Sequence, residues 1–200
     1  MEDIRVSIVE DVAEIREGMC FIVNQTPGFS CVSVFSGGEE ASIGLRGNPA
    51  DIVVMDIALP GSSGPDCIRR LRAGGSGMQF VVFTIYEDSD QVFEALAAGA
   101  SGYLLKDTPP ERIIAALRDL YEGGAPMSAA IARKVATSFQ RPGHVHDLSP
   151  REVEILGLLS KGFLYKEIAD RLHIGVGAVG QHIHRIYDEL HVQNRAIFEL

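Results

Sequence analysis

Five polar side chains, each placed where an apolar stretch of the sequence ends, have the types needed for chemistry on a phosphoryl group. They are Glu10, Asp11, Asp56, Thr84 and Lys106. Carboxylates that lie close together repel one another unless a cation is present, and a hard divalent ion such as Mg²⁺ accepts one or two of them while keeping its waters. A lysine and a hydroxyl at the same point make sense if a phosphoryl group arrives there. The ammonium and the metal would neutralise its oxygens, and a carboxylate can attack phosphorus.

The elements that must position these side chains alternate between strands and helices. Apolar runs predict strands, with a helical pattern after each one, at 4–9, 29–35, 52–55, 80–84 and 101–105. Five β-then-α repeats within residues 1–122 predict an α/β fold, a doubly wound, five-stranded parallel sheet with helices on both faces. Such sheets bind their ligands beyond the carboxyl ends of the strands, which is where the polar side chains stand.

Residues 148–200 change to short helical patterns, and residues 123–147 form a linker with one predicted helix from Ser128 to about Phe139. A cap, a proline at the first helical position and a capping-box glutamate predict a helix start at Ser149-Pro150-Arg151-Glu152. Ser36 and Glu39 have the same spacing earlier in the chain. Three short helices with a tight turn between the second and third predict a small all-α helix-turn-helix domain.

The bulk composition fits an ordinary globular protein with a net charge of −9, and its acidic residues are concentrated in residues 1–122. This distribution favours a cation site over a polyanion site in the first domain. No apolar run approaches the ~18 residues of a membrane span, and Met1-Glu2-Asp3 does not begin a signal segment. Three cysteines without a CxxC motif are typical of reduced, mostly buried thiols, so we expect a cytoplasmic protein without a membrane partner.

Together these residues resemble a two-component response regulator of the NarL/FixJ type, a CheY-like receiver joined to a LuxR-type helix-turn-helix domain. In the receiver the resemblance rests on Glu10-Asp11, Met55-Asp56 with Leu59-Pro60-Gly61, Thr84 and the run 99–107. In the second domain it rests on these stretches: 148–152, 166–169, 172–174, Val179, His182, Ile186, Leu190 and 194–195. The resemblance covers essentially the whole chain and implies the flavodoxin-like strand order of CheY.

The resemblance implies a role for each receiver residue. Asp56 is expected to be the phosphoacceptor, with Lys106 pairing with the phosphoryl group. Asp11 is expected to ligate Mg²⁺ directly, together with Asp56 and the backbone carbonyl of Ala58, while Glu10 assists through water. The switch residues would be Thr84, which follows the phosphoryl group inward, and Tyr103, which rotates into the space vacated. The implied partners are a sensor histidine kinase and, after phosphorylation, a second copy of the chain.

A different enzyme class also uses an aspartate nucleophile at a strand end. Dehalogenase-like phosphatases need a second aspartate two residues further on, and that position here is Ala58. We therefore expect a regulator, and no enzyme activity beyond self-phosphorylation and slow self-dephosphorylation at Asp56.

The second domain departs from the LuxR-type pattern where DNA contacts are expected. The customary Thr-Val-Lys is Ala178-Val179-Gly180, and a customary lysine is Glu189. Each lost lysine removes about one phosphate contact, and Gly177 and Gly180 each cost a helix ~1 kcal/mol relative to alanine. The remaining candidates for DNA contact are Lys166, Arg171, Gln181, His184, Arg185 and Arg195, and among these Gln181 could bind adenine bidentately.

Two functions therefore remain open from the sequence. The first is a DNA-binding transcriptional regulator that is switched by phosphorylation of Asp56. The alternative is a receiver whose helix-turn-helix has lost specific DNA binding and acts as a protein-interaction or dimerisation module, which Gly177, Gly180 and Glu189 favour.

Overall fold

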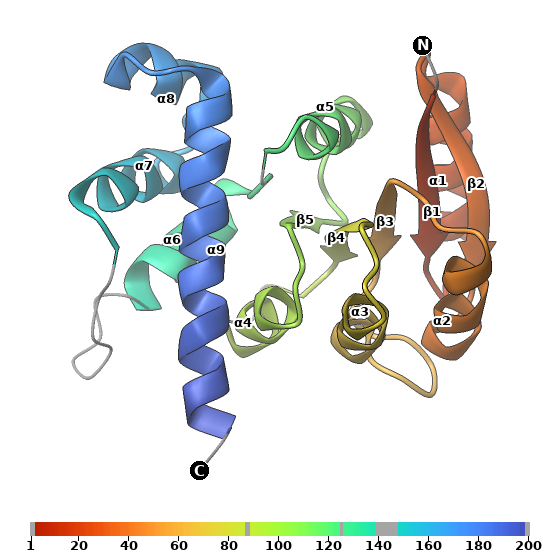
Figure 1. Ribbon diagram of the computed structural model, residues 1–200. Helices are drawn as coiled ribbons and strands as arrows, with labels where there is room; N and C mark the ends of the chain where they lie inside the picture. Colours follow the sequence, from red (N-terminus) through yellow and green to blue (C-terminus); the bar gives the residue numbers. More distant parts are fainter. Residues whose placement is uncertain (1–2, 87–88, 125, 139–147, 199–200) are drawn as a thin grey trace.

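The computed structural model describes residues 3–86, 89–124, 126–138 and 148–198. Its first part is a parallel five-stranded sheet in the order β2-β1-β3-β4-β5 (Figure 1). The strands are β1 Ile4–Val9, β2 Phe29–Phe35, β3 Ile52–Met55, β4 Gln79–Thr84 and β5 Gly102–Leu105. This arrangement confirms the predicted doubly wound α/β fold and its CheY-like strand order.

Helices cover both faces of the sheet because successive strand residues point to opposite faces. Ile52 and Val54 pack with α1 (Ala13–Gln25) and α5 (Pro110–Tyr121) on one face. Val53 and Met55 pack with helices of the other face, α2 (Gly38–Gly47), α3 (Gly64–Ala73) and α4 (Ser89–Ala97). All four residues of β3 are buried, as a central parallel strand requires.

The helical domain follows α6 (Ala129–Ser138) and comprises α7 (Pro150–Ser160), α8 (Tyr165–Leu172) and α9 (Val176–Phe198). The capping box at Ser149 is confirmed, because its hydroxyl accepts from Glu152 N and its own N–H donates to the Glu152 carboxylate at 2.7 Å. The Ser128 hydroxyl accepts from Ile131 N at 3.3 Å at the start of α6, as predicted. Arg141–His144 of the predicted linker lie outside the described residues.

One detail of the predicted helices is wrong. The expected capping box between Ser36 and Glu39 does not form, since α2 begins one residue later than that spacing requires and Ser36 donates to Glu40 Oε2 instead, at 3.3 Å. In the described part, α9 runs unbroken from Val176 to Phe198. Its buried apolar face includes Val179, Ile183 and Ile186.

The two domains are packed against each other along α4 and α9, which lie side by side in Figure 1. One continuous apolar cluster includes Val92 and Leu96 of α4 together with Ile155 of α7 and Val179 of α9. The core on this face of the sheet therefore continues into the helical domain.

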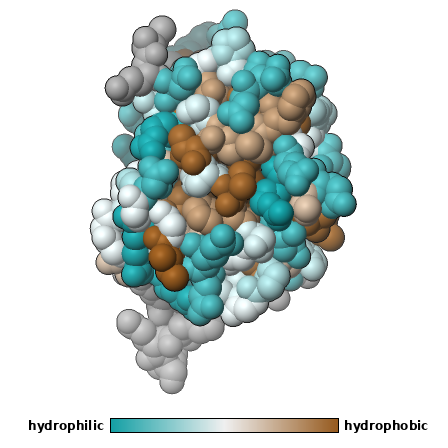
Figure 2. All heavy atoms as spheres, turned by 90° about the vertical axis from the view of Figure 1, so that its right-hand side faces the viewer, coloured by the Kyte–Doolittle hydropathy of each residue, from teal (hydrophilic) through white to brown (hydrophobic). Residues whose placement is uncertain are grey.

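The opposite side of the molecule is the edge formed by β2 with α1 and α2. Figure 2 shows separate apolar side chains among polar ones on this side. Exposed apolar residues on these elements are Phe21, Val34 and Ile43. Single exposed apolar residues of this kind are normal on a protein surface. Among the described residues, the helices are too short or too polar to cross a membrane.

Candidate functional site

The carboxyl ends of β1, β3, β4 and β5 bring the five polar side chains to one edge of the sheet. The register pairs Val9 with Met55, Met55 with Val82 and Thr84 with Leu105, so the strands end nearly level. Asp56 N donates to Val9 O at 2.9 Å, which fixes the residue directly beside the end of β1. The predicted convergence of these strand ends is therefore present in the structure.

Three carboxylates form the acidic part of this pocket. Oxygens of Glu10, Asp11 and Asp56 lie within 4.8 Å of one another. Glu10 and Asp56 are 2% and 5% exposed, whereas Asp11 is open to solvent. A set of acidic oxygens with one open side fits a hard divalent cation that keeps part of its water shell.

Lys106 supplies the balancing charge in this structure. Its ammonium donates to Asp56 Oδ2 at 2.9 Å and lies 2.7 Å from Glu10 Oε2. The backbone of Lys106 is held by its N–H, which donates to Thr84 O at 2.9 Å. The other Asp56 oxygen, Oδ1, accepts from Ile57 N at 2.7 Å. Both oxygens of Asp56 therefore have defined donors, and the carboxylate is oriented from two sides.

The pKa values in the pocket follow from burial and from these charges. Burial raises the pKa of Glu10, and the charge of Asp56 adds to this effect, while Lys106 opposes it. Burial alone would lower the pKa of Lys106, but its hydrogen bonds and charge interactions with Glu10 and Asp56 outweigh burial and raise it. The lysine is thus held firmly in its cationic form next to the carboxylates.

Thr84 and Tyr103 lie on adjacent strands and are both fully buried. Thr84 Oγ1 accepts from Tyr86 N at 3.4 Å, and the Tyr103 hydroxyl donates to Tyr86 O at 3.0 Å. Both side chains therefore meet the backbone of one residue in the segment between β4 and α4. In this conformation the ring of Tyr103 is buried and its hydroxyl is held by Tyr86 O, and the expected rotation of the ring on phosphorylation stays a prediction.

Two further residues, which were not expected from the sequence, shape the pocket. A side-chain carbon at Gly64 would collide with the backbone carbonyl of Asp56, and Gly64 N donates to Ile57 O at 2.9 Å. Arg16 donates to the backbone carbonyls of Glu10 and Asp11 at 2.7 and 3.1 Å. The sequence signal for Gly64 was its place one residue before Pro65 at a helix start. Nothing in the local sequence pointed to Arg16.

Ala58, the expected backbone ligand, lies in the exposed part of the turn after Asp56.

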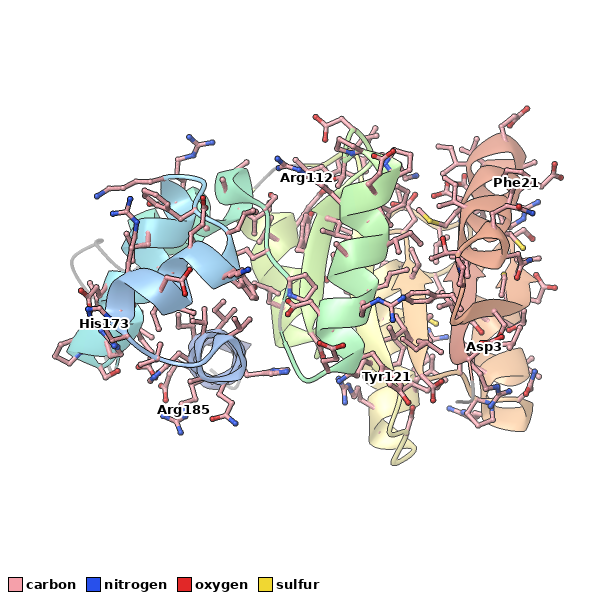
Figure 3. All side chains as sticks on the ribbon, turned by 90° about the horizontal axis from the view of Figure 1, so that it is seen from above. Asp3, Phe21, Arg112, Tyr121, His173 and Arg185 are labelled. Carbon is pink, nitrogen blue, oxygen red and sulfur yellow. The ribbon has the colours of Figure 1, made fainter. Side chains whose placement is uncertain are left out.

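The DNA-contact candidates do not share one surface environment. Lys166, Arg171, Gln181 and Arg185 are exposed, while His184 is half-buried. The guanidinium of Arg171 lies over the ring of Phe163, 4.1 Å from its centroid. Figure 3 shows Arg185 on the outer side of the helical domain, away from the sheet. The side chain of Arg195 is outside the described part.

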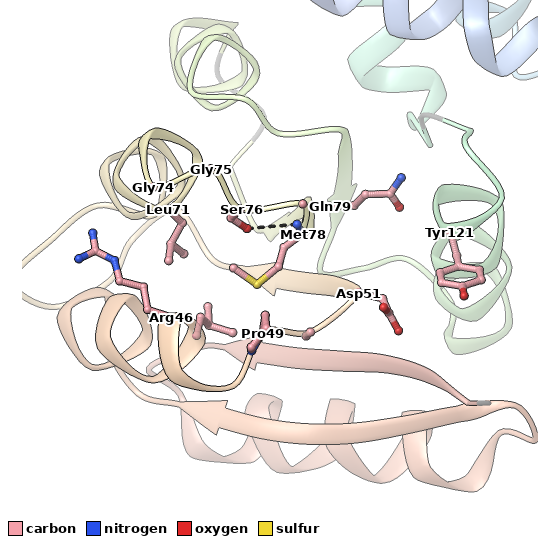
Figure 4. Close-up of a pocket in the computed structure, with 13 residues that line it drawn as sticks. Arg46, Pro49, Asp51, Leu71, Gly74, Gly75, Ser76, Met78, Gln79 and Tyr121 are labelled. Atoms are coloured by element: carbon pink, nitrogen blue, oxygen red, sulfur yellow. Dashed lines mark hydrogen bonds between the residues drawn. The ribbon is translucent and has the colours of Figure 1, made fainter.

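A second hollow, of about 680 Å³, lies at the opposite end of the sheet (Figure 4). It is lined by the loop Gly74–Gly77 together with Arg46, Asp51 and Tyr121, and it opens broadly to solvent. The five chemically competent side chains are all at the other edge, so this hollow is separate from the phosphoryl chemistry proposed for them.

An acidic pocket with a lysine at the carboxyl edge of a five-stranded parallel sheet, followed by a helix-turn-helix, defines the class of response regulators. The chain belongs to this family. The model of the response regulator receiver domain matches residues 6–118, and that of bacterial regulatory proteins of the luxR family matches residues 146–197. The chain is therefore a response regulator with a receiver and a LuxR-type DNA-binding domain.

Similar proteins cover nearly the full length of the chain. The transcriptional regulatory protein LnrK of Bacillus subtilis is 29% identical over 96% of this chain and 93% of its own. The crystal structure of ChrA, the response regulator of a heme-sensing two-component system, has a TM-score of 0.58 at 31% identity and covers 94% and 90% of the two chains. RcsB of Salmonella enterica serovar Typhimurium, solved bound to a promoter, has a TM-score of 0.63 over 94% and 92%. At 22% identity it supports the fold alone.

Proposed function

We propose that Asp56 accepts a phosphoryl group from a sensor histidine kinase and that this modification switches DNA binding by the helical domain. The observation that carries the proposal is the Asp56 carboxylate, buried at a strand end and contacted by Lys106 at 2.9 Å. A carboxylate placed in this way is a nucleophile with a cation ready beside it. We assign the receiver to residues 1–122, the linker to 123–147 and the DNA-binding domain to 148–200.

The transfer step follows from the donors around Asp56. One carboxylate oxygen attacks phosphorus, a new O–P bond forms, and the bond from phosphorus to the kinase histidine nitrogen breaks. Oδ1 accepts from Ile57 N, whereas Oδ2 faces the mobile end of the Lys106 side chain, which can turn to the incoming phosphoryl oxygens, so we assign Oδ2 as the nucleophile. Lys106 then stabilises the negative oxygens of the phosphoryl group, and Thr84 donates a hydrogen bond to one of them after leaving Tyr86 N.

The acidic residues fit Mg²⁺ as the cofactor of this reaction. Asp11, Asp56 and the carbonyl of Ala58 would hold the ion, with Glu10 acting through water. The ion supplies charge neutralisation when bound. The exposed side of the pocket at Asp11 leaves room for its remaining waters.

The switch would be transmitted to the segment between β4 and α4. Thr84 and Tyr103 both bond the backbone of Tyr86, so a shift of Thr84 toward the phosphoryl group removes one of two contacts there. The neighbouring helix α4 packs against α9 of the helical domain. A change in this segment therefore acts on the contact between the two domains.

The position of α9 explains why DNA binding would need such a switch. A recognition helix must enter the major groove, and Gly180 and His184, one turn apart on one side of α9, are buried and half-buried here. Gln181 and Arg185 are exposed on an adjacent side. We propose that separation from α4 frees the covered side, and that two copies of the chain then pair on DNA.

The alternative of a helix-turn-helix without DNA binding gains no support. Gly180, one of the three residues that favoured it with Gly177 and Glu189, packs against Gly124 of the linker in the closed arrangement of the domains. Its small size therefore has a packing reason that is independent of DNA. No observation favours a pure interaction module over a regulator.

Two measurements test the proposal. Mg²⁺ and a small phosphodonor such as acetyl phosphate should label the protein, and Asp56→Asn should abolish the label while the matched surface variant Asp66→Asn keeps it. Labelling of Asp56→Asn at the same level would refute the assignment. The protein activated with beryllofluoride should also enrich a half-site motif from random DNA at physiological salt, and failure to enrich any motif would count against regulated DNA binding.

A further inference from the structure

The linker residues just after α5 touch both β5, the strand that carries Tyr103, and α9, the proposed recognition helix. These residues are Gly123, Gly124, Pro126 and Met127, here called the bridging segment. Gly124, Pro126 and Met127 are buried. A short segment that is buried between two domains can transmit a displacement of one domain to the other, provided that both of its contacts are rigid.

The first contact extends the sheet beyond β5. Tyr103 N donates to Pro126 O at 3.0 Å, and Tyr103 forms an isolated parallel bridge with Met127. The segment thus covers the edge of β5 at the switch tyrosine itself. An added Cβ at Gly102 would lie 2.8 Å from Pro126 Cγ and 3.1 Å from Pro126 O, so this close approach requires a glycine.

The second contact is made by α9. An added Cβ at Gly180 would lie 2.9 Å from Gly124 Cα and 3.4 Å from Gly123 O. The recognition helix therefore rests on the backbone of the bridging segment with no side chain between them. Backbone atoms cannot move aside as the end of a flexible side chain can, which makes this contact sensitive to a single methyl group.

The segment is also anchored to the receiver. Gly124 N donates to Asp119 O at 2.7 Å, and Gly123 N donates to Leu120 O at 3.0 Å, so both bonds tie it to the end of α5. With one end fixed, a movement of the β5 backbone at Tyr103 changes the conformation of the segment rather than its overall position.

From these contacts we infer that the bridging segment physically couples Tyr103 to the recognition helix, and that Gly180 is the positioning residue through which α9 engages it. The regulatory meaning of this link rests on the proposed function, but the link itself does not. It gives a reason for glycine at a position where a lysine is customary, since a lysine could not be accommodated against Gly124.

Hydrogen exchange of the full-length, unphosphorylated protein tests the link from both ends. Gly180→Ala should speed exchange of the Tyr103 amide at least tenfold, because α9 can no longer hold the segment against β5. Gly177→Ala is the matched control, since it lies in the same helix with open space around it and gains the same helix propensity. This control should leave the Tyr103 amide unchanged.

In the reverse direction, Gly102→Ala should speed exchange of the Ile183 amide in α9 at least tenfold, with Gly77→Ala, also in open space, as its control. If Gly102→Ala fails to fold, Gly180→Lys, which leaves the sheet unchanged, repeats the first measurement with a larger side chain. Where both variants fold, a response in neither direction, or in one only, overturns the link, because a coupling free energy is reciprocal. Where Gly102→Ala does not fold, an unchanged Tyr103 amide in Gly180→Lys overturns it. Failure to label Asp56 would defeat the proposed function and leave this result standing.

Discussion

The acidic pocket and the proposed DNA-contact surface of α9 are built in opposite ways. In the pocket, the buried Glu10 and Asp56 both contact the largely covered Lys106, so the charge of each side chain is balanced by its neighbours. On the helical domain, Gln181 and Arg185 are exposed and stand apart from the core. Residues that contact one another can be identified together as one site. Single exposed side chains, in contrast, act only through contact with a binding partner. Substitutions in the pocket should therefore have larger effects than substitutions on the helical domain.

Replacing Lys106 by methionine should have the largest effect. This substitution leaves two buried carboxylates without their cation. In the absence of Mg²⁺ it should lower the free energy of unfolding by about 3 kcal/mol, as the removal of one partner from a buried ion pair does in other proteins. Urea denaturation with and without Mg²⁺ measures this, and Mg²⁺ should restore part of the loss. The matched control is Lys161→Met at an exposed position. Equal stability of the two variants would show that the pocket is not mutually dependent.

Gly64→Ala should also impair the pocket, through the backbone rather than through charge. The new methyl group collides with the Asp56 carbonyl, and overpacking of this kind costs about 2 kcal/mol. We expect slower labelling of Asp56 by a phosphodonor together with a lower Tm. Gly47→Ala, where nothing lies within 4 Å, is the control and should label normally. Normal labelling of Gly64→Ala would mean that the turn adapts without moving Asp56.

Gln181→Ala and Arg185→Ala should distinguish a base contact from a phosphate contact on the proposed DNA-contact surface of α9. Loss of a bidentate glutamine contact costs about 1–2 kcal/mol of discrimination at one base pair, so Gln181→Ala should weaken the preferred site and leave random DNA unaffected. Loss of a phosphate contact should weaken all DNA equally and flatten the salt dependence, as expected for Arg185→Ala. Fluorescence anisotropy over a range of salt concentrations distinguishes them, and identical profiles for the two variants would contradict these assignments.

Asp119→Asn should have the smallest effect, and the effect should depend on pH. Burial, with the charge of Glu122, raises the pKa of Asp119 to about 6. Since the unfolded pKa is lower, the folded state binds more protons between about pH 4 and 6, and stability is lost as pH rises through this window. The asparagine variant should therefore be more stable by about 1 kcal/mol above pH 6, after allowance for solvent screening of this half-buried group.

At pH 4 the Asp119→Asn variant and the unchanged protein should have the same stability. Thermal unfolding at pH 4 and pH 7.5 checks the expectation. Glu122→Gln is the companion variant, because it removes the charge that acts on Asp119 and should give a smaller gain of the same sign. A loss of stability at pH 7.5 in Asp119→Asn would show that the carboxylate is favourable where it lies.

Much of the fold and most of the pocket could be predicted because both depend on local patterns. Short apolar runs such as 52–55 indicated the strands, and the rule that parallel strands carry ligands at their carboxyl ends brought Asp56 and Lys106 together. The sequence could not show that Gly64 touches the Asp56 carbonyl or that Gly180 touches Gly124. Such contacts join segments through backbone geometry, and glycine has many other reasons to occur.

Competition between two neighbouring glutamates explains why the capping box at the start of α2 was predicted wrongly. Both Glu39 and Glu40 follow Ser36 closely, and the spacing rule selected Glu39 although the backbone favours Glu40. The hydrogen bond between the Tyr103 hydroxyl and Tyr86 O joins two separate segments, and no periodicity in the sequence reveals it.

The apolar cluster that joins the face of α4 to the helical domain has a consequence for how the protein unfolds. Because Leu96, Val179 and Ile155 belong to one core, heat should melt both domains in a single calorimetric transition while they are closed. Separation of the domains would divide that core and give two transitions, with the small helical domain melting at the lower temperature. Activation would then exchange part of the thermal stability of the DNA-binding domain for its freedom to move.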